Sequence, residues 1–149
     1  MGFAAELRRR RQEAGLTQAQ LAKLAGTSQS RVSSYEAGTV EPSPATRERL
    51  LAAAKPLPGF ALYHHRVEIK RLARKYHLDN VRVFGSVARH EDTRRSDIDL
   101  VVTRRDGVSV FKIAAFAALV EDLVGYRVDV VSDYGRDESD PVIAEALAL

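Results

Sequence analysis

Up to about residue 54, the apolar positions recur at the spacing of α-helices, and glycines interrupt this spacing at the places where helices would end. Helices are expected over residues 4–14, 18–25, 28–37 and 44–54. A glycine follows each of the first three, and glycine readily takes the left-handed conformation that closes a helix. The side chains expected to form the common core of this bundle are Leu7, Leu16, Leu21, Leu24, Val32, Leu50 and Leu51.

The pattern changes after the stretch KPLPGF at residues 55–60, which contains two prolines and a glycine. Each proline lacks a backbone donor and restricts the residue before it, so no helix is expected to run through this stretch. We predict two domains, residues 1–55 and 61–149, joined by a short linker. The elements expected in the second domain are helices at residues 61–77 and 110–124, strands at residues 81–85, 97–103 and 126–132, and a short helix from residue 141.

Composition narrows the class of protein. The 149 residues are 45% hydrophobic and 29% charged, which is sufficient for a folded core. There is no cysteine, so disulfides and thiolate metal sites are excluded. No apolar run reaches the roughly 18 residues that would span a bilayer, and the N-terminus has no signal-peptide core. We therefore expect a cytoplasmic protein with no membrane partner.

The net charge of +3 is unevenly distributed along the chain. Residues 1–60 have 9 Lys and Arg against 5 Asp and Glu, whereas residues 61–149 have 14 against 15. The positive excess therefore lies in the first domain, as expected if that domain meets a polyanion. The arginines at residues 8–11 point around a helix in all directions, and most of them are expected to be solvated.

The segment LTQAQLAKLAGTSQSRVSSYEAG, residues 16–38, has the layout of a helix-turn-helix, in which one helix supports a second whose exposed face can enter a DNA groove. The second helix is rich in side chains that hydrogen-bond to bases or phosphates. Val32 and Tyr35 are expected to point back into the bundle. The alternative is a helical bundle that only mediates protein contacts.

This segment resembles the XRE (phage-repressor-like) helix-turn-helix family. The residues that carry the resemblance are Thr17, Gln18, Leu21, Ala22, Ala25, Val32, Ser33, Glu36 and Gly38. The resemblance implies that the protein binds operator DNA, usually as a homodimer on a two-fold site. The residues expected to contact DNA are Gln18, Ser28, Gln29, Ser30, Arg31 and Ser34.

Asp97 and Asp99 raise a different question, because they are two residues apart in SDIDLVV, a stretch that otherwise favours a buried strand. Side chains two apart on a strand point to the same side, where like charges repel, and a bound cation would compensate. Asp129 lies between apolar neighbours in a later strand, and the glycine-serine pair at residues 85–86 ends an earlier one. Each feature alone is typical of surface loops, edges or turns. Together they predict two Mg²⁺ ions held by three carboxylates and a triphosphate at the Gly-Ser corner, as in-line phosphoryl or nucleotidyl transfer requires.

The motif GSVARHEDTRRSDIDLVV resembles the minimal nucleotidyltransferase (MNT) group of the polymerase-beta-like superfamily. The resemblance implies a small α/β nucleotidyltransferase domain with a short mixed sheet, following the all-α helix-turn-helix bundle. If the roles of the family's motif residues apply to this sequence, Asp97 and Asp99 bind both metals and Asp129 activates the acceptor hydroxyl. The residues implied to contact the phosphates, or to lie near them, are Gly85, Ser86, Arg89 and Ser96. His90 departs from the pattern, which usually has glycine there.

MNT proteins are commonly antitoxins that transfer AMP to a partner toxin of the HEPN class. The resemblance therefore implies a Mg²⁺-dependent enzyme that uses ATP or another NTP, with the toxin as a separate chain. Two other interpretations stay open. One is a nucleotidyltransferase toxin acting on tRNA, or less readily on an antibiotic. The other is a non-enzymatic repressor whose second domain only binds a nucleotide or a partner.

Overall fold

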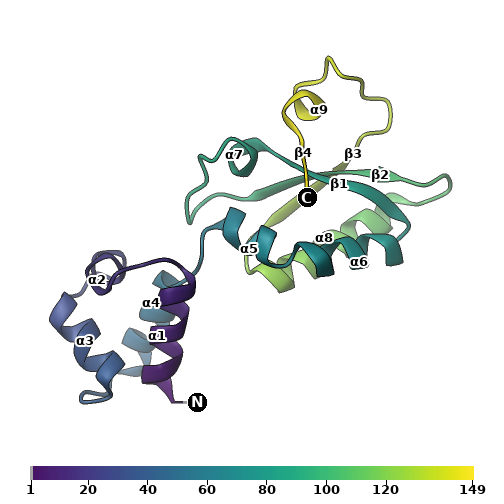
Figure 1. Cartoon of the computed structure of the whole chain (residues 1–149). Coiled ribbons are helices and arrows are strands. Elements are labelled where there is room, and N and C mark those ends of the chain that lie inside the picture. The colour runs from purple at the N-terminus through teal and green to yellow at the C-terminus, as the bar shows by residue number, and fades with distance from the viewer. Residues whose placement is uncertain (1) are drawn as a thin grey trace. The chain divides into compact units, whose positions relative to one another are not determined.

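The computed structural model describes residues 2–149 and divides the chain into two compact units, one ending at Pro56 and the other spanning Leu57–Leu149 (Figure 1). The first unit is helical and the second combines helices with a mixed sheet, which confirms the predicted fold class. Each unit has its own apolar core. None of the helices within residues 2–149 has the length and apolar character needed to cross a bilayer.

The N-terminal unit consists of α1 (Phe3–Glu13), α2 (Gln18–Ala25), α3 (Gln29–Ala37) and α4 (Pro44–Ala53). Side chains define where three of these helices begin. Thr17 and Gln20 form a reciprocal capping box at α2, and the hydroxyls of Ser28 and Ser43 cap α3 and α4. The helix boundaries follow from these local signals.

Most of the expected core of this unit is buried: Leu7, Leu21, Val32, Tyr35 and Leu50 lie inside, and Leu16 and Leu51 pack at its margin. Leu24 was predicted to be buried but is 48% exposed. The buried face of α2 is formed by Leu21, Ala22 and Ala25, and Leu24 projects beside that face. A short helix has room for only one narrow buried stripe.

The second unit begins with α5 (Pro58–His64) and α6 (Arg66–Lys75), separated at His65. The single helix predicted for residues 61–77 is therefore wrong. Pro58 stands in the first turn of α5, where its missing N–H is not needed, so the helix starts inside the stretch expected to be a linker. Leu62 and Ile69 nevertheless both reach the core.

The sheet has the order β3-β2-β1-β4, with β2 parallel to β3 and antiparallel to β1. Its strands are β1 (Leu78–Phe84), β2 (Ile98–Arg104), β3 (Val128–Ser132) and β4 (Leu147–Ala148). The two-residue β4, which was not predicted, pairs with β1. A strand this short has no readable alternation in the sequence.

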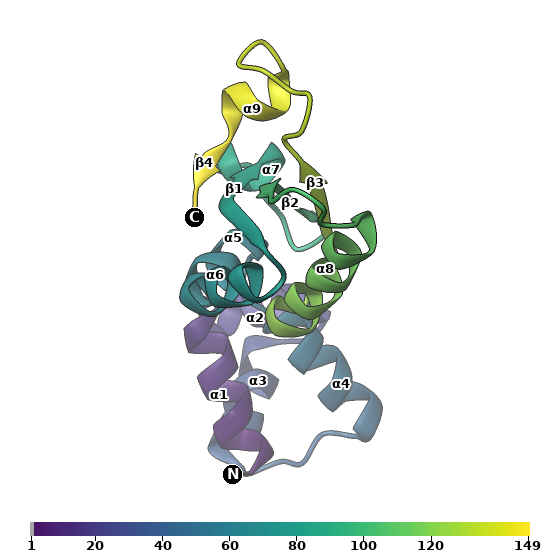
Figure 2. The same cartoon turned by 90° about the vertical axis from the view of Figure 1, so that its right-hand side faces the viewer.

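Helices α6 and α8 (Val110–Val124) lie on one side of the sheet, and the short helices α7 (Gly85–Ala88) and α9 (Pro141–Glu145) lie away from them (Figures 1 and 2). Ile98, Leu100 and Val102 of β2 point into the core with Phe116 of α8. Because side chains alternate along a strand, Asp99 points to the opposite face. Asp99 therefore lies on the sheet face opposite α6 and α8, the face on which Val101 is also buried.

Candidate active site and nucleic-acid interface

Asp99 of β2 lies directly opposite Asp129 of β3 in the parallel register. Neighbouring strands are about 4.8 Å apart, so the two carboxylates start from adjacent backbone positions. Asp97 is exposed and immediately precedes β2, separated from Asp99 by the fully buried Ile98. The parallel pairing of β2 with β3 thus gathers the three predicted catalytic residues at one end of the sheet.

Asp99 has surroundings that disfavour its charge. Burial raises the pKa of Asp99, and the negative charges of Asp129, Asp97 and Glu145 raise it further, while Arg89 opposes them only in part. Asp129 is half exposed, with its Oδ1 atom 3.7 Å from Nη2 of Arg127. The protein itself leaves the negative charge at this end of the sheet incompletely neutralised.

The chemistry of these donors fits Mg²⁺, which prefers carboxylate and phosphate oxygens. No three histidine, aspartate or glutamate side chains within residues 2–149 form a ready ligand set for a metal ion. Mg²⁺ is usually bound through one or two carboxylates together with substrate phosphates and water, so a complete protein cage is not required. The incompletely neutralised Asp99 is consistent with a cation that arrives with a nucleotide.

Gly85 follows β1 at the point where the chain passes Asp99. Its φ angle is +71°, and a Cβ atom added there would lie 2.5 Å from Oδ2 of Asp99. Both the positive φ and the close approach require glycine. The next residue, Ser86, is half-buried in α7. The structure therefore brings the predicted Gly-Ser corner against the predicted metal ligand.

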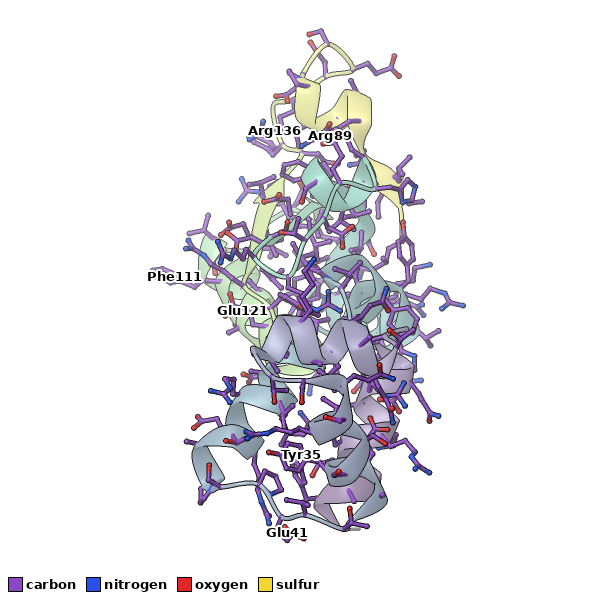
Figure 3. All side chains as sticks on the ribbon, turned by 90° about the vertical axis from the view of Figure 1, so that its left-hand side faces the viewer. Tyr35, Glu41, Arg89, Phe111, Glu121 and Arg136 are labelled. Carbon is purple, nitrogen blue, oxygen red and sulfur yellow. The ribbon has the colours of Figure 1, made fainter. Side chains whose placement is uncertain are left out.

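Glu145, at the end of α9, occupies this corner. Its Oε1 atom accepts a hydrogen bond of 2.8 Å from the Gly85 N–H, and Oε2 accepts one of 3.0 Å from Arg89 Nη1. The Gly85 N–H and the Arg89 guanidinium together hold the pKa of Glu145 below its ordinary range. Figure 3 shows Arg89 beside α9. No motif surrounds Glu145, so sequence reasoning missed this contact.

Arg89, His90 and Ser96 lie in the loop region between α7 and β2. Arg89 also donates to Glu91 over 3.0 Å, and Ser96 Oγ accepts the Thr93 N–H at 2.9 Å, which closes a turn. His90 has a φ angle of +57°. This left-handed conformation explains why glycine suits the position, and histidine is among the residues that tolerate it better than most. His90 thus adopts a backbone conformation that a glycine at this position would also allow.

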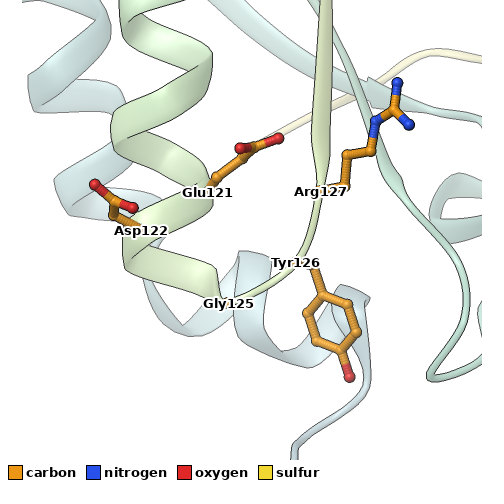
Figure 4. Close-up of a pocket in the computed structure, with 5 residues that line it drawn as sticks. All are labelled: Glu121, Asp122, Gly125, Tyr126 and Arg127. Atoms are coloured by element: carbon orange, nitrogen blue, oxygen red, sulfur yellow. The ribbon is translucent and has the colours of Figure 1, made fainter.

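A surface hollow lies at the turn between α8 and β3 (Figure 4). It is lined by Glu121, Asp122, Gly125, Tyr126 and Arg127. Glu121 accepts a 2.9 Å hydrogen bond from the N–H of Val128, which ties α8 to the start of β3. None of the predicted site residues lines this hollow. Arg127, one of the lining residues, is also the side chain that approaches Asp129.

In the N-terminal unit, the predicted recognition helix α3 presents Gln29, Ser30 and Arg31 to solvent. Ser28 Oγ accepts the Arg31 N–H at the start of the helix, and Ser34 Oγ donates to the Ser30 carbonyl. The Ser30 hydroxyl lies 3.1 Å from that of Ser28, so Gln29 and Arg31 are the side chains more available for external hydrogen bonds. Both come from the first turn of α3, the part of a recognition helix that usually meets base edges.

The buried side of the same helix carries a carboxylate, Glu36, that is only 5% exposed. Arg11 donates to both of its oxygens, at 2.5 and 3.0 Å, and Gln18 Nε2 donates at 3.0 Å. Arg8 approaches within 3.8 Å. Arg11 is thus a structural residue, not a solvated one. The amide nitrogen of Gln18, a predicted DNA contact, is engaged inside the unit.

Residues 67–148 match the family model described as polymerase beta nucleotidyltransferase, and residues 3–55 match a helix-turn-helix domain model. "Putative protein adenylyltransferase MJ0126" of Methanocaldococcus jannaschii is 33% identical over 63 residues, or 42% of this chain and 64% of that protein. The chain thus spans somewhat less than two thirds of that curated relative.

One solved structure supports the fold of the second unit. A structure described as "putative minimal nucleotidyltransferase" covers 61% of this chain and 95% of its own, with a TM-score of 0.55 and 35% identity. A toxin-antitoxin structure with AMP-PNP covers 55% of this chain and 69% of its own, with a TM-score of 0.48 and 22% identity. The second likeness is too low to support an inference about nucleotide or partner. The matches to the two family models and the first structure confirm the resemblances seen in the motifs.

Proposed function

The chain belongs to the polymerase beta nucleotidyltransferase family and carries a helix-turn-helix domain, and on that premise we propose that it is a DNA-binding antitoxin. It transfers a nucleotidyl group, AMP from ATP in the simplest case, to a hydroxyl of a separate toxin and binds its own operator. The single observation that carries the chemistry is the pairing of Asp99 with Asp129 beside Gly85.

In this reaction the acceptor oxygen bonds to the α-phosphorus of the nucleotide while the bond to the diphosphate breaks. Asp129 is half exposed, so it is accessible to an incoming hydroxyl and takes its proton. Asp97 and Asp99 would hold two Mg²⁺ ions, which would neutralise phosphate charge when bound. Gly85, Ser86 and Arg89 orient the phosphates, while Ser96 maintains the loop that precedes Asp97.

Operator binding rests on the match to the helix-turn-helix model and on the exposed first turn of α3. Gln29 pairs with adenine and Arg31 with guanine in the simplest reading of a major groove. Ser28, Ser30 and Ser34 contact phosphates or base edges, and Gln18 contributes its remaining carbonyl oxygen. A homodimer on a two-fold site supplies the affinity that one small domain lacks.

The toxin partner is inferred from the resemblance to the MNT group, whose usual partner is a HEPN protein. The curated relative with 33% identity, named as a protein adenylyltransferase, supports a protein acceptor, although the match covers only part of both chains. The alternatives are a nucleotidyltransferase toxin acting on tRNA and a non-enzymatic repressor. The first alternative differs from the proposal in its acceptor, which is RNA, and the second requires no catalysis.

The test is an intact-mass measurement on the protein encoded beside this one. That protein is incubated with Mg²⁺, each NTP and either the wild type or the double variant Asp97→Ala, Asp99→Ala. We expect a gain of whole nucleotidyl units with the wild type only. A second variant, Gln29→Ala with Arg31→Ala, is the matched control, because it should lose operator binding in a gel-shift assay and keep transfer.

Two results would redirect the proposal. No mass gain on the neighbouring protein, together with labelling of tRNA, would favour the toxin alternative. Toxin neutralisation that survives the double Asp variant would show that catalysis is not the mechanism of inhibition.

A further inference from the structure

The carboxylate of Glu145 is bound where phosphate oxygens are expected. It accepts hydrogen bonds from the Gly85 N–H at 2.8 Å and from Arg89 Nη1 at 3.0 and 3.3 Å. Gly85 and Arg89 are two of the residues assigned above to the triphosphate. A carboxylate and a phosphate present similar anionic oxygens to N–H and guanidinium donors. Glu145 therefore satisfies the donors that a nucleotide would need.

Charge repulsion prevents the Glu145 carboxylate and a triphosphate from binding to the same donors at the same time. Glu145 is a fourth carboxylate beside Asp97, Asp99 and Asp129, and its charge acts on Asp99. A triphosphate at the same donors would place further negative charge within a few ångströms of Glu145. Like charges at such distances repel strongly in a partly buried setting. Either the glutamate or the phosphate can hold the Gly85 N–H, but not both.

The segment that carries Glu145 is anchored on both sides. Ahead of it, the Asp140 carboxylate caps α9 by accepting the Val142 N–H. Behind it, β4 pairs with β1 through Leu147 opposite Val83, and the Leu149 N–H donates to Val81 over 3.1 Å. Leu149 itself is 7% exposed. The side chain of Glu145 is thus delivered to the corner by an ordered element of the fold.

We propose that Glu145 is a built-in competitor of the nucleotide, which closes the phosphate corner and must leave before a triphosphate binds. The ligand class rests on the proposed function, since it is the nucleotidyltransferase site that calls for a triphosphate. Displacement needs only a turn of the Glu145 side chain away from Gly85, so β4 keeps its pairing with β1. The contact lowers the apparent affinity for NTP and leaves the chemical step to other residues.

The experiment measures binding without any acceptor. Isothermal titration of the full chain uses two probes, AMP-PNP with Mg²⁺ and inorganic tripolyphosphate with Mg²⁺. Glu145→Gln removes the charge and keeps the shape of the side chain, and we expect it to bind both probes about five- to ten-fold more tightly than the wild type. Glu138→Gln is the matched control: it makes the same charge change at an exposed position of the same segment and should alter affinity by less than about two-fold.

A structural readout accompanies the titration. The NMR resonance of the Gly85 amide reports its hydrogen bond directly, and it should shift in Glu145→Gln and when either probe binds the wild type. Glu138→Gln should leave it unchanged. The same spectra show whether each variant retains the wild-type fold.

The outcomes separate this inference from the proposed function. Tighter binding by Glu145→Gln supports the inference even if the wild type transfers no label to any acceptor, a result that would count against the proposed function alone. Equal or weaker binding would overturn the inference, because Glu145 would then be a residue that orients Arg89. Failure of both proteins to bind either probe would overturn it as well, since the freed donors would not form a phosphate site.

Discussion

Glu36 in the N-terminal unit is buried and Asp99 in the C-terminal unit is partly buried, and the surroundings of these two carboxylates have opposite charge. Glu36 receives hydrogen bonds from Arg11 and Gln18 and lies near Arg8. Asp99 has the carboxylates of Asp97, Asp129 and Glu145 around it, and Arg89 opposes them only in part.

The difference distinguishes a charge that holds a fold from a charge that serves a reaction. A buried carboxylate with its own cations stabilises the folded state only while the set is complete, and removing one member is costly. A carboxylate surrounded by like charges destabilises the folded state. Such an arrangement is expected where a cation or a reacting group is to be bound.

The largest expected effect is on the stability of the N-terminal unit. Glu36→Ala leaves Arg11, whose side chain is 13% exposed, without its main partner, and we expect a loss of about 3–5 kcal/mol in the free energy of unfolding. Calorimetric unfolding of the full chain measures this loss. Glu13→Ala is the control, because its pair with Arg9 is exposed and contributes no more than about 0.5 kcal/mol. Similar small losses in both variants would mean that the Arg11–Glu36 pair does not hold the unit together.

A smaller loss of stability is expected in the N-terminal unit when the pH is lowered. Burial works to raise the pKa of Glu36, but the hydrogen bonds from Arg11 and Gln18 and the nearby arginine charges outweigh it, so the net shift is downward. The ionised form therefore stabilises the folded state above the unfolded pKa of about 4.3, and this stabilisation disappears as the pH falls through the lower folded value. We expect the N-terminal unit to lose stability through this group as the pH falls from 6 to 2.

Unfolding followed by circular dichroism over that pH range checks this expectation, with Glu36→Gln as the matched variant. The variant cannot titrate at residue 36, so its stability should depend less steeply on pH than that of the wild type. An equal pH dependence in both proteins would assign the acid sensitivity to other carboxylates.

The smallest expected effect is an increase in the free energy of unfolding. Burial and three neighbouring carboxylates raise the pKa of Asp99, so the charged form at neutral pH destabilises the fold. Asp99→Asn should therefore increase the free energy of unfolding by about 1 kcal/mol while transfer activity is lost. Asp106→Asn, a change at an exposed turn, should alter neither quantity appreciably. Destabilisation by Asp99→Asn would contradict the contrast with Glu36.

Local signals in the sequence determined much of the fold and the identity of the site residues. The caps at Thr17 and Ser43 and the glycines after the helices located most helix boundaries of the N-terminal unit, because capping is a contact between residues two or three apart. The order of Gly85, Asp97, Asp99 and Asp129 along predicted strands likewise identified the family and the candidate site.

Tertiary structure alone decided the contacts between residues far apart in the chain. It paired Arg11 with Glu36, where the sequence suggested a solvated arginine, and it brought Glu145 to Gly85 through the pairing of β4 with β1. It also separated α5 from α6 at His65. No short-range pattern encodes such contacts, because they depend on how strands pair and helices pack. The sequence therefore determined which groups are available, and the packing of the chain determined which of them meet.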